Sequence, residues 1–72
     1  MTTLEAINFA ANVTVGTRIV ANKLILVVKE IQKDRFKGVV EYKGKERKGD
    51  VFLSFETLLN SHYCKDIKIL KH

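Results

Sequence analysis

The sequence predicts one small, mainly β domain with a short helix at its N-terminus and a single helical turn before its last strand. Its 72 residues suffice for one domain and not for two. Apolar and polar side chains alternate through residues 36–55, as they do in half-buried strands. Between residues 13 and 28 β-branched side chains are frequent, which also favours strands.

The first residues carry the signature of a helix start. Thr2 is followed three positions later by Glu5, the spacing of a capping box, and a helix is expected over about residues 3–11. One face of this helix is apolar and is expected to pack over an open end of the sheet; it consists of Leu4, Ile7 and Ala11. Phe9 lies off that stripe, where it either extends the packed face or marks a surface for self-association.

Five strands are expected after the helix. They are placed at about residues 13–20, 23–33, 36–43, 50–55 and 66–70. In the second strand the alternation slips by one position between Val28 and Ile31, which indicates a bulge or a strong bend. Residues 56–60 read as one helical turn, and Ile67 and Ile69 complete the core from the last strand.

The third and fourth strands are expected to form a hairpin. Pairing Lys43 with Asp50 sets Tyr42 opposite Val51, and the connection over residues 44–49 begins and ends with glycine. This register gathers the large apolar side chains on one face, with two exceptions, Val39 and Phe52.

This order of elements resembles the SH3-like small-barrel superfold, which includes Tudor, KOW and Sm-like members. The resemblance covers residues 13–70 and consists of five short strands, a bend in the second strand and a helical turn before the fifth. It implies a five-stranded barrel over residues 13–70 preceded by a helical segment in residues 1–12, an arrangement compatible with the Sm-like members. Barrels of this superfold commonly serve as protein-interaction modules.

Patterns that carry catalysis or hold a cofactor are not found in the sequence. Ser61-His62-Tyr63-Cys64 is the densest candidate, but neighbouring side chains diverge, whereas nucleophile and base normally come from distant segments. His62, Cys64, His72 and Asp66 match no zinc spacing, and the four glycines are scattered singly. We therefore expect no enzyme, no metal and no cofactor.

The charge pattern gives the strongest functional signal. Thirteen Lys and Arg face eight Asp and Glu, for a net charge of +5. The expected hairpin loop and its flanks carry four of these cations, namely Lys43, Lys45, Arg47 and Lys48. Three further cations are expected to support them from the neighbouring turn: Lys33, Arg35 and Lys37. Phe52, which points away from the expected core, would add a base-stacking or partner-binding surface, so the leading hypothesis is binding of DNA or RNA.

A second hypothesis is a protein-interaction module or a small inhibitor that engages a larger, acidic partner protein through Phe52 or an exposed barrel edge. The chain is expected to be a monomer or a small homo-oligomer, and assembly into a ring by edge-strand pairing stays open. The single Cys64 suits the reducing cytoplasm. The longest apolar run, residues 24–28, is too short to span a membrane, so no membrane partner is expected.

Overall fold

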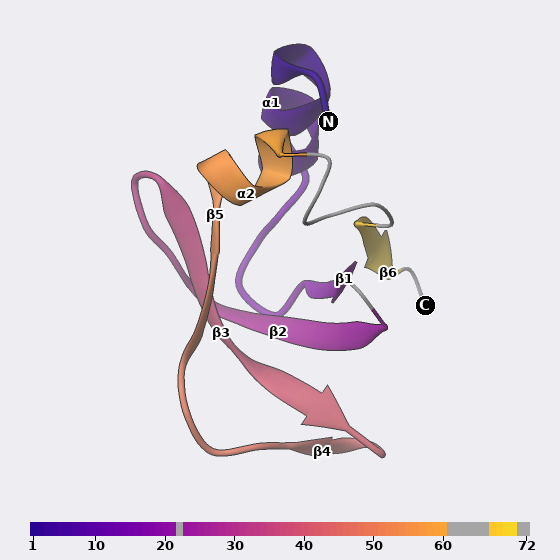
Figure 1. The fold of residues 1–72 in the computed structure, drawn as a ribbon. Coiled ribbons are helices and arrows are strands. Elements are labelled where there is room, and N and C mark those ends of the chain that lie inside the picture. The colour runs from indigo at the N-terminus through magenta and orange to yellow at the C-terminus, as the bar shows by residue number, and fades with distance from the viewer. Residues whose placement is uncertain (22, 61–66, 71–72) are drawn as a thin grey trace.

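A computed structural model describes residues 1–21, 23–60 and 67–70 of the chain. It is mainly β, with one antiparallel sheet and two short helices (Figure 1). The described elements are, in chain order, α1 (Thr3–Ala11), β1 (Arg18–Ala21), β2 (Leu24–Ile31), β3 (Arg35–Tyr42), β4 (Lys45–Glu46), β5 (Val51–Ser54), α2 (Phe55–Leu59) and β6 (Lys68–Leu70). The mainly β class is confirmed, together with a helix before the first strand and another before the last.

The sheet has the strand order β4-β3-β2-β1-β6, and β5 also pairs with β3. Because β2 occupies one edge of β3, β4 and β5 share the other edge one after the other. The described residues form no pairs between β6 and the β4–β5 edge, so the sheet is not closed. The sequence predicts five strands, whereas six are described, because residues 45 and 46 of the predicted loop form an additional strand, β4, and the predicted fourth strand corresponds to β5.

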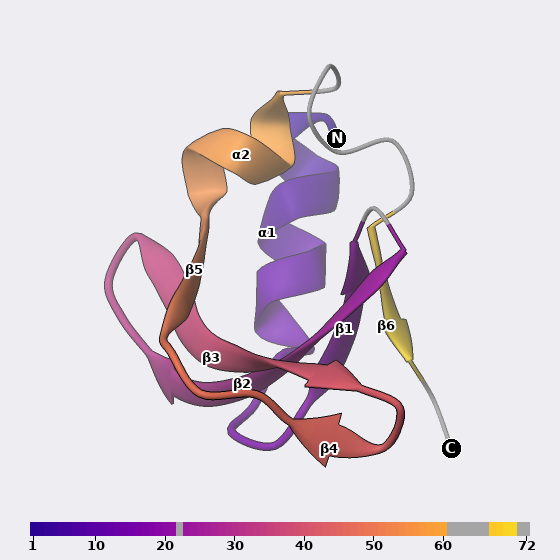
Figure 2. The ribbon, with the colours of Figure 1, turned by 60° about the horizontal axis from the view of Figure 1, so that its bottom comes forward.

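The sheet curves around the helices. Figure 2 shows α1 lying across the concave side of the sheet, between β5 and β1. The core fills the space between this concave face and the two helices, and its buried residues are Ala6, Val13, Ile19, Leu26, Val28, Phe36, Leu53 and Leu58. In Figure 1 both helices lie at the end of the sheet opposite to β4, so they leave the β4 end of the concave face uncovered.

The start of α1 follows the predicted capping box. The Glu5 N–H donates to Thr2 Oγ1 at 3.2 Å, and the Thr2 N–H donates to Glu5 Oε1 at 2.9 Å. Two N–H groups that a helix start leaves without partners are satisfied in this way. The predicted boundaries of this helix are confirmed.

The predicted packing face of α1 is wrong. Leu4 is 68% exposed and Ile7 is 54% exposed, whereas Ala6 is buried and Phe9 packs against the core. Ala11, the third member of the predicted face, is also exposed. The helix is apolar on two faces, and the face that contains Ala6 packs against the concave sheet. The small side chain of Ala6 lets the helix backbone approach the sheet closely.

The first strand begins later than predicted. Residues 14–17 form a turn in which the Thr17 N–H donates to the Thr14 carbonyl at 3.0 Å, and Gly16 has a φ of +94°. Val13 is buried in the core although it belongs to no strand. Its β-branched side chain therefore reflects burial and not strand pairing.

The predicted bulge in the second strand is confirmed. The pairing of β2 with β3 shifts between Val28 and Glu30, so two residues of β2 face one of β3. Gly38, which pairs with Val28, lies so close to β2 that an added Cβ would be 2.1 Å from the Val27 carbonyl oxygen. The bend of the sheet thus depends on the absence of a side chain at Gly38.

The predicted hairpin register is wrong by six positions at β4 and by four positions at β5, both even shifts. Lys45 pairs with Tyr42, and Val51 pairs with Gly38 instead of with Tyr42. The six-residue loop is replaced by a two-residue turn at Lys43 and Gly44, whose φ angles are +51° and +77°. Two positive φ angles are typical of the type I′ turn, whose twist matches that of the flanking strands. Since the shift is even, each residue keeps its predicted face of the sheet.

The chain end returns to the core through α2 and β6. Ser54 caps α2 by accepting a hydrogen bond from the Thr57 N–H at 3.1 Å, and Leu58 of this helix is fully buried. β6 pairs with β1, which places Ile69 opposite Ile19, and Ile69 packs against the core as predicted, as does Ile67. The predicted start of this strand, Asp66, lies outside the described residues.

Candidate nucleic-acid interface

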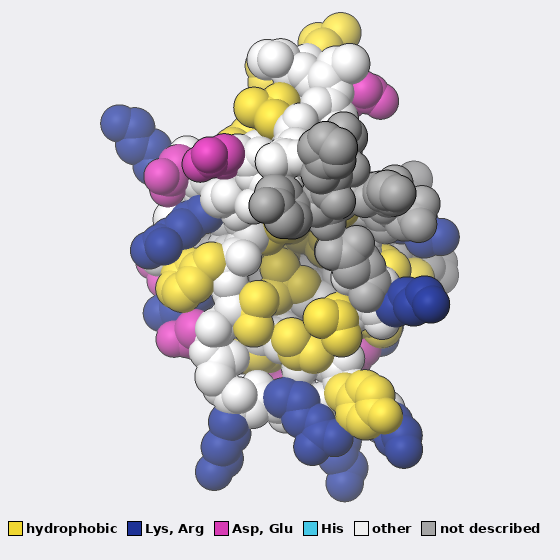
Figure 3. Space-filling view, viewed as in Figure 1, with side chains coloured by type: hydrophobic (Ala, Val, Ile, Leu, Met, Phe, Trp, Pro, Cys, Tyr) yellow, Lys and Arg dark blue, Asp and Glu magenta, His cyan; other side chains and the backbone are white. Residues whose placement is uncertain are grey.

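Four cations gather at the β3–β4 hairpin, at the end of the sheet away from the helices. This group, the basic tip, consists of Lys43, Lys45, Arg47 and Lys48, all of them exposed. None of the four forms an ion pair with a described residue. In Figure 3, dark-blue Lys and Arg side chains project from this end of the molecule beside a yellow hydrophobic cluster. The tip is therefore an accessible source of positive charge.

The connection from β4 to β5 displays part of this charge. Four residues, 47–50, stand opposite two residues of β3, because the pairing moves from Glu41–Glu46 to Gly38–Val51. The Arg47 N–H still donates to the Val40 carbonyl at 2.8 Å, whereas Gly49 has a φ of +106° and turns the chain back toward β5. The extra residues carry Lys48 away from the sheet.

Tyr42, the last residue of β3, supplies an aromatic surface within the tip. It lies on the concave side of the sheet, as predicted, but beyond the cover of the helices, and it is 49% exposed. Lys43 Nζ lies 5.4 Å from the centroid of its ring, and Arg47 Cζ lies 5.1 Å from the same point. Sequence reasoning missed this site because it assigned every apolar residue of that face to the core.

A second turn lies at the same end of the sheet. β1 and β2 are joined at residues 22–23, and Ile25 near the start of β2 pairs with Glu41 near the end of β3. Lys23 is exposed and has a φ of +68°, and the following Leu24 is 53% exposed. Among the described residues, Lys23 and Lys43 are the two non-glycine residues with positive φ. The asparagine at position 22 of the sequence, a residue type that favours turns, was the available sequence signal for this hairpin.

The three supporting cations occupy a different place. β3 runs about 23 Å from Arg35 to Tyr42 at the usual rise per strand residue. Lys33 and Arg35 are therefore at the far end of β3 from the basic tip, and Lys37 lies within the strand. The structure does not join them with the tip into one patch.

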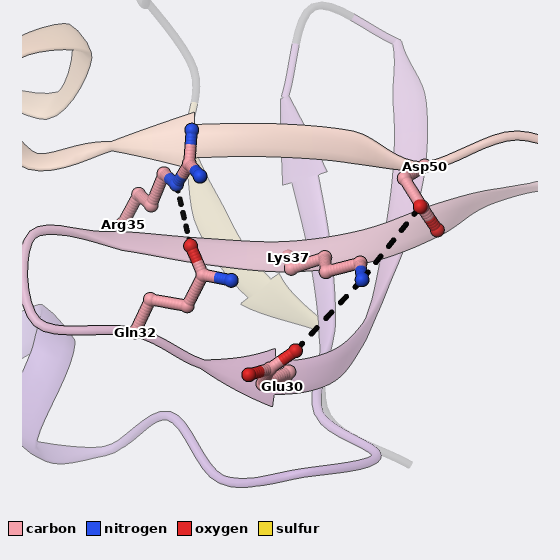
Figure 4. Close-up of polar contacts among 5 residues, drawn as sticks. All are labelled: Glu30, Gln32, Arg35, Lys37 and Asp50. Atoms are coloured by element: carbon pink, nitrogen blue, oxygen red, sulfur yellow. Dashed lines mark hydrogen bonds and ion pairs between the residues drawn. The ribbon is translucent and has the colours of Figure 1, made fainter.

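Two of these supporting cations already have partners on the outer, convex face of the sheet (Figure 4). Lys37 Nζ lies 3.9 Å from a Glu30 carboxylate oxygen and 3.7 Å from one of Asp50. Arg35 donates a hydrogen bond from Nε to the side-chain oxygen of Gln32. Local partners reduce what both cations can offer to a polyanion.

Other cations of the outer face are paired as well. Arg18 of β1 reaches across β2 to Glu41 of β3, and both side chains are largely buried. Lys29 Nζ lies 2.8 Å from a Glu46 carboxylate oxygen. Arg18, Lys29 and Lys37 of the outer face thus have carboxylate partners, in contrast to the cations of the basic tip.

Phe52 points away from the core, as predicted, and is 46% exposed. It lies opposite Lys37, with the Arg35 guanidinium carbon 4.1 Å above its ring centroid. It therefore accompanies the supporting cations on the outer face and does not lie beside the basic tip.

A groove of about 620 Å³ runs along α1 and β6. Its described lining includes one acidic and one basic side chain, Glu5 and Lys68, among residues such as Asn8, Phe9 and Ile67. It lies on the helix side of the molecule and shares no described lining residue with the basic tip.

The segment 61–64 and the residues His72 and Asp66 all lie outside the described residues. In the part of the chain that is described, no cluster of three or more His, Cys, Asp or Glu side chains is arranged to hold a metal ion. None of the described helices is long and apolar enough to cross a membrane.

No protein-family model, curated protein or solved structure matches this chain.

Proposed function

We propose that this chain is a non-catalytic, nucleic-acid-binding module whose basic tip contacts phosphates. The observation that carries the proposal is the contrast in charge pairing. Arg18, Lys29 and Lys37 have carboxylate partners, whereas none of the four tip cations forms an ion pair with a described residue. Unpaired cations on a projecting hairpin are free to neutralise phosphates and release their counterions.

Backbone geometry supports the proposal. A left-handed conformation costs an ordinary L-residue about 1–2 kcal/mol, and asparagine or glycine is the usual choice there. Lys23 and Lys43 both adopt it, in turns at the same end of the sheet. Because the turn itself favours asparagine or glycine, a lysine at such a position supports a role for its charge.

We also propose that the fold is a small barrel of the SH3-like type. The meander order, the bulged β2 and the helix before the last strand support this assignment. We place the module in the cytoplasm, where its single cysteine would stay reduced.

The test is a salt series with fluorescent single-stranded and double-stranded DNA and RNA. The double variant Lys45→Glu/Lys48→Glu reverses two unpaired tip cations. The matched control Lys33→Glu/Lys68→Glu makes the same change in net charge at two exposed cations away from the tip. We expect the tip variant to lose at least tenfold in affinity at low salt, and the control to lose much less. Removing two phosphate contacts should also lower the slope of log K against log salt by about 2.

An absence of binding by the wild-type chain at low salt would overturn the proposal. Equal losses in the tip variant and in its control would assign the binding to net charge alone. Circular dichroism of both variants establishes that the sheet is intact.

A second candidate function is binding of an acidic partner protein. It is favoured by the exposed aliphatic side chains Leu24 and Val51, which lie on the concave face, Val51 opposite Gly38 in the middle of β3, and offer more to a peptide than to a phosphate backbone. Leu24→Ser/Val51→Ser would weaken the binding of a protein partner and leave the affinity for nucleic acid unchanged. Phe52→Ala tests the outer face as the anchor of such a partner.

A further inference from the structure

The aromatic ring of Tyr42 is the least expected feature of the basic tip. Half of the residue is exposed, although β3 as a whole packs against the core and its Phe36 is buried. The Tyr42 hydroxyl accepts and donates no hydrogen bond within the described part of the chain. The ring thus lies at the end of a strand and is contacted by two exposed cations.

A nucleic-acid base can make a stronger contact with the Tyr42 ring than the two cations do. Lys43 and Arg47 lie over the ring at 5.4 and 5.1 Å, near the outer limit of a cation–π contact. At an exposed site such a contact is weaker than the stacking of a nucleic-acid base on an aromatic side chain. A base that stacks on Tyr42 would displace a cation from the ring, and the cation would then be free to contact the flanking phosphate.

The chemistry of the surroundings favours an unpaired base over a duplex. The face of a base is accessible for stacking only where the base is unstacked, as in a single strand or a loop. Reading a duplex through its groove would need side chains that contact base edges in a bidentate way, but Lys23, Lys43 and Lys45 are point charges. Arg47, which could do so, is the cation already engaged with the ring.

We infer that the hairpin end binds single-stranded nucleic acid by stacking an unpaired base on Tyr42, with Lys23, Lys43 and Arg47 beside it as contacts for the adjacent phosphates. Leu24, which is exposed and on the same face of the sheet, precedes Ile25, the partner of Glu41 beside Tyr42. This inference rests on the proposed function and specifies its ligand.

The first test compares Tyr42→Leu with Tyr42→Phe, using unstructured single-stranded oligonucleotides and duplexes of the same length. Tyr42→Leu should weaken single-strand binding about tenfold without changing the salt slope, because no charge is removed. Tyr42→Phe should retain the affinity, since the ring is kept. Phe52→Leu is the matched control, because it removes another half-exposed ring that also lies under an arginine.

The second test reads the ring directly. The chain has two tyrosines and no tryptophan, so in a Tyr63→Phe background Tyr42 is the single tyrosine emitter. Stacking of a base should quench this emission on addition of a single strand, and a duplex at equal phosphate concentration should quench it much less.

The outcomes separate the inference from the proposed function. If single strands and duplexes bind equally, lose affinity in Lys45→Glu/Lys48→Glu and are unaffected by Tyr42→Leu, the tip is a phosphate site and the stacking inference fails. A preference for duplex DNA would also overturn it, as it would point to insertion of the hairpin into the major groove. If no nucleic acid binds, the proposed function fails first.

Discussion

At Gly38 the second and third strands approach so closely that no side chain fits between them. The nearest atom to an added Cβ, at 2.1 Å, is the Val27 carbonyl oxygen, which belongs to the backbone and cannot rotate away. We expect Gly38→Ala to destabilise the fold by about 3 kcal/mol, at the upper end of overpacking effects. Urea denaturation measures this change.

Gly44→Asn is the control for that experiment. Gly44 has open space around the position of a Cβ, and its positive φ is one that asparagine tolerates. It should change stability by much less than Gly38→Ala. Similar losses for both substitutions would show that the strands can separate at Gly38 at little cost.

At position 43 we expect the residue that best stabilises the turn to differ from the residue that best binds nucleic acid. Asparagine followed by glycine is the preferred pair for a two-residue turn with positive φ, so Lys43→Asn should stabilise the fold by about 0.5–1 kcal/mol. The same substitution removes a tip charge and should lower affinity for single-stranded RNA several-fold. Thermal denaturation and a binding titration measure the two effects on one sample. If the variant gains stability and keeps full affinity, Lys43 does not belong to the binding site.

The α1 helix should make stability depend on pH. The hydrogen bond from the Thr2 backbone N–H, together with that involving the Thr2 side chain, lowers the pKa of Glu5 below its ordinary value of 4.5. A carboxyl whose pKa is lowered by folding stabilises the fold above its unfolded pKa, and this contribution is lost as the pH falls through the folded pKa. The charged capping box is therefore fully effective at neutral pH and weakens below about pH 4.5.

Glu5→Gln isolates this effect, because glutamine still accepts the Thr2 N–H but does not titrate. The wild type should have the higher midpoint of thermal denaturation at pH 7, and the difference should shrink as the pH falls below 4.5. All other carboxyl groups are common to both proteins. A difference that stays constant with pH would contradict a role for the Glu5 charge.

How well each element could be predicted depended on whether its signal was local. The capping box of Thr2 and Glu5 and the slipped alternation after Val28 are local patterns, and both gave the right structure. The hairpin register depends on turn geometry, and the pattern fixed only its parity, so Val51 was paired with the wrong residue on the right face.

Positions that depend on where an element ends were not predictable in this way. Alternation places Tyr42 on the concave face but does not reveal that the helices stop short of it. Likewise, Leu4 and Ile7 have helical spacing, yet the curvature of the sheet selects the face that contains Ala6. The sequence thus predicted the four cations of the basic tip, whereas Lys23 and the ring of Tyr42 were placed beside them only by the fold.

For the molecule as a whole, binding and stability should be coupled. At a free oligonucleotide concentration about 100 times Kd, binding to the folded state adds about 2.7 kcal/mol. For a domain of this size, that corresponds to an increase of about 10 °C or more in the denaturation midpoint. We expect the increase with single-stranded RNA at low salt for the wild type and for Lys33→Glu/Lys68→Glu. In Lys45→Glu/Lys48→Glu a tenfold weaker affinity at the same oligonucleotide concentration leaves about 1.4 kcal/mol, so the increase should fall to about half or less. The same increase in both variants would show that the tip does not bind the ligand.

The order in which the strands pair has a consequence for folding. The turns that join β1 to β2 and β3 to β4 are two residues long, whereas the pairing of Ile19 with Ile69 joins residues 50 positions apart. Closing short loops costs the least chain entropy, so we expect the meander to form ahead of the β1–β6 pairing. During synthesis, both turns that display Lys23 and Lys43 emerge before the last strand does. We therefore expect the hairpin end that we propose as the binding surface to form first, before β6 pairs with β1.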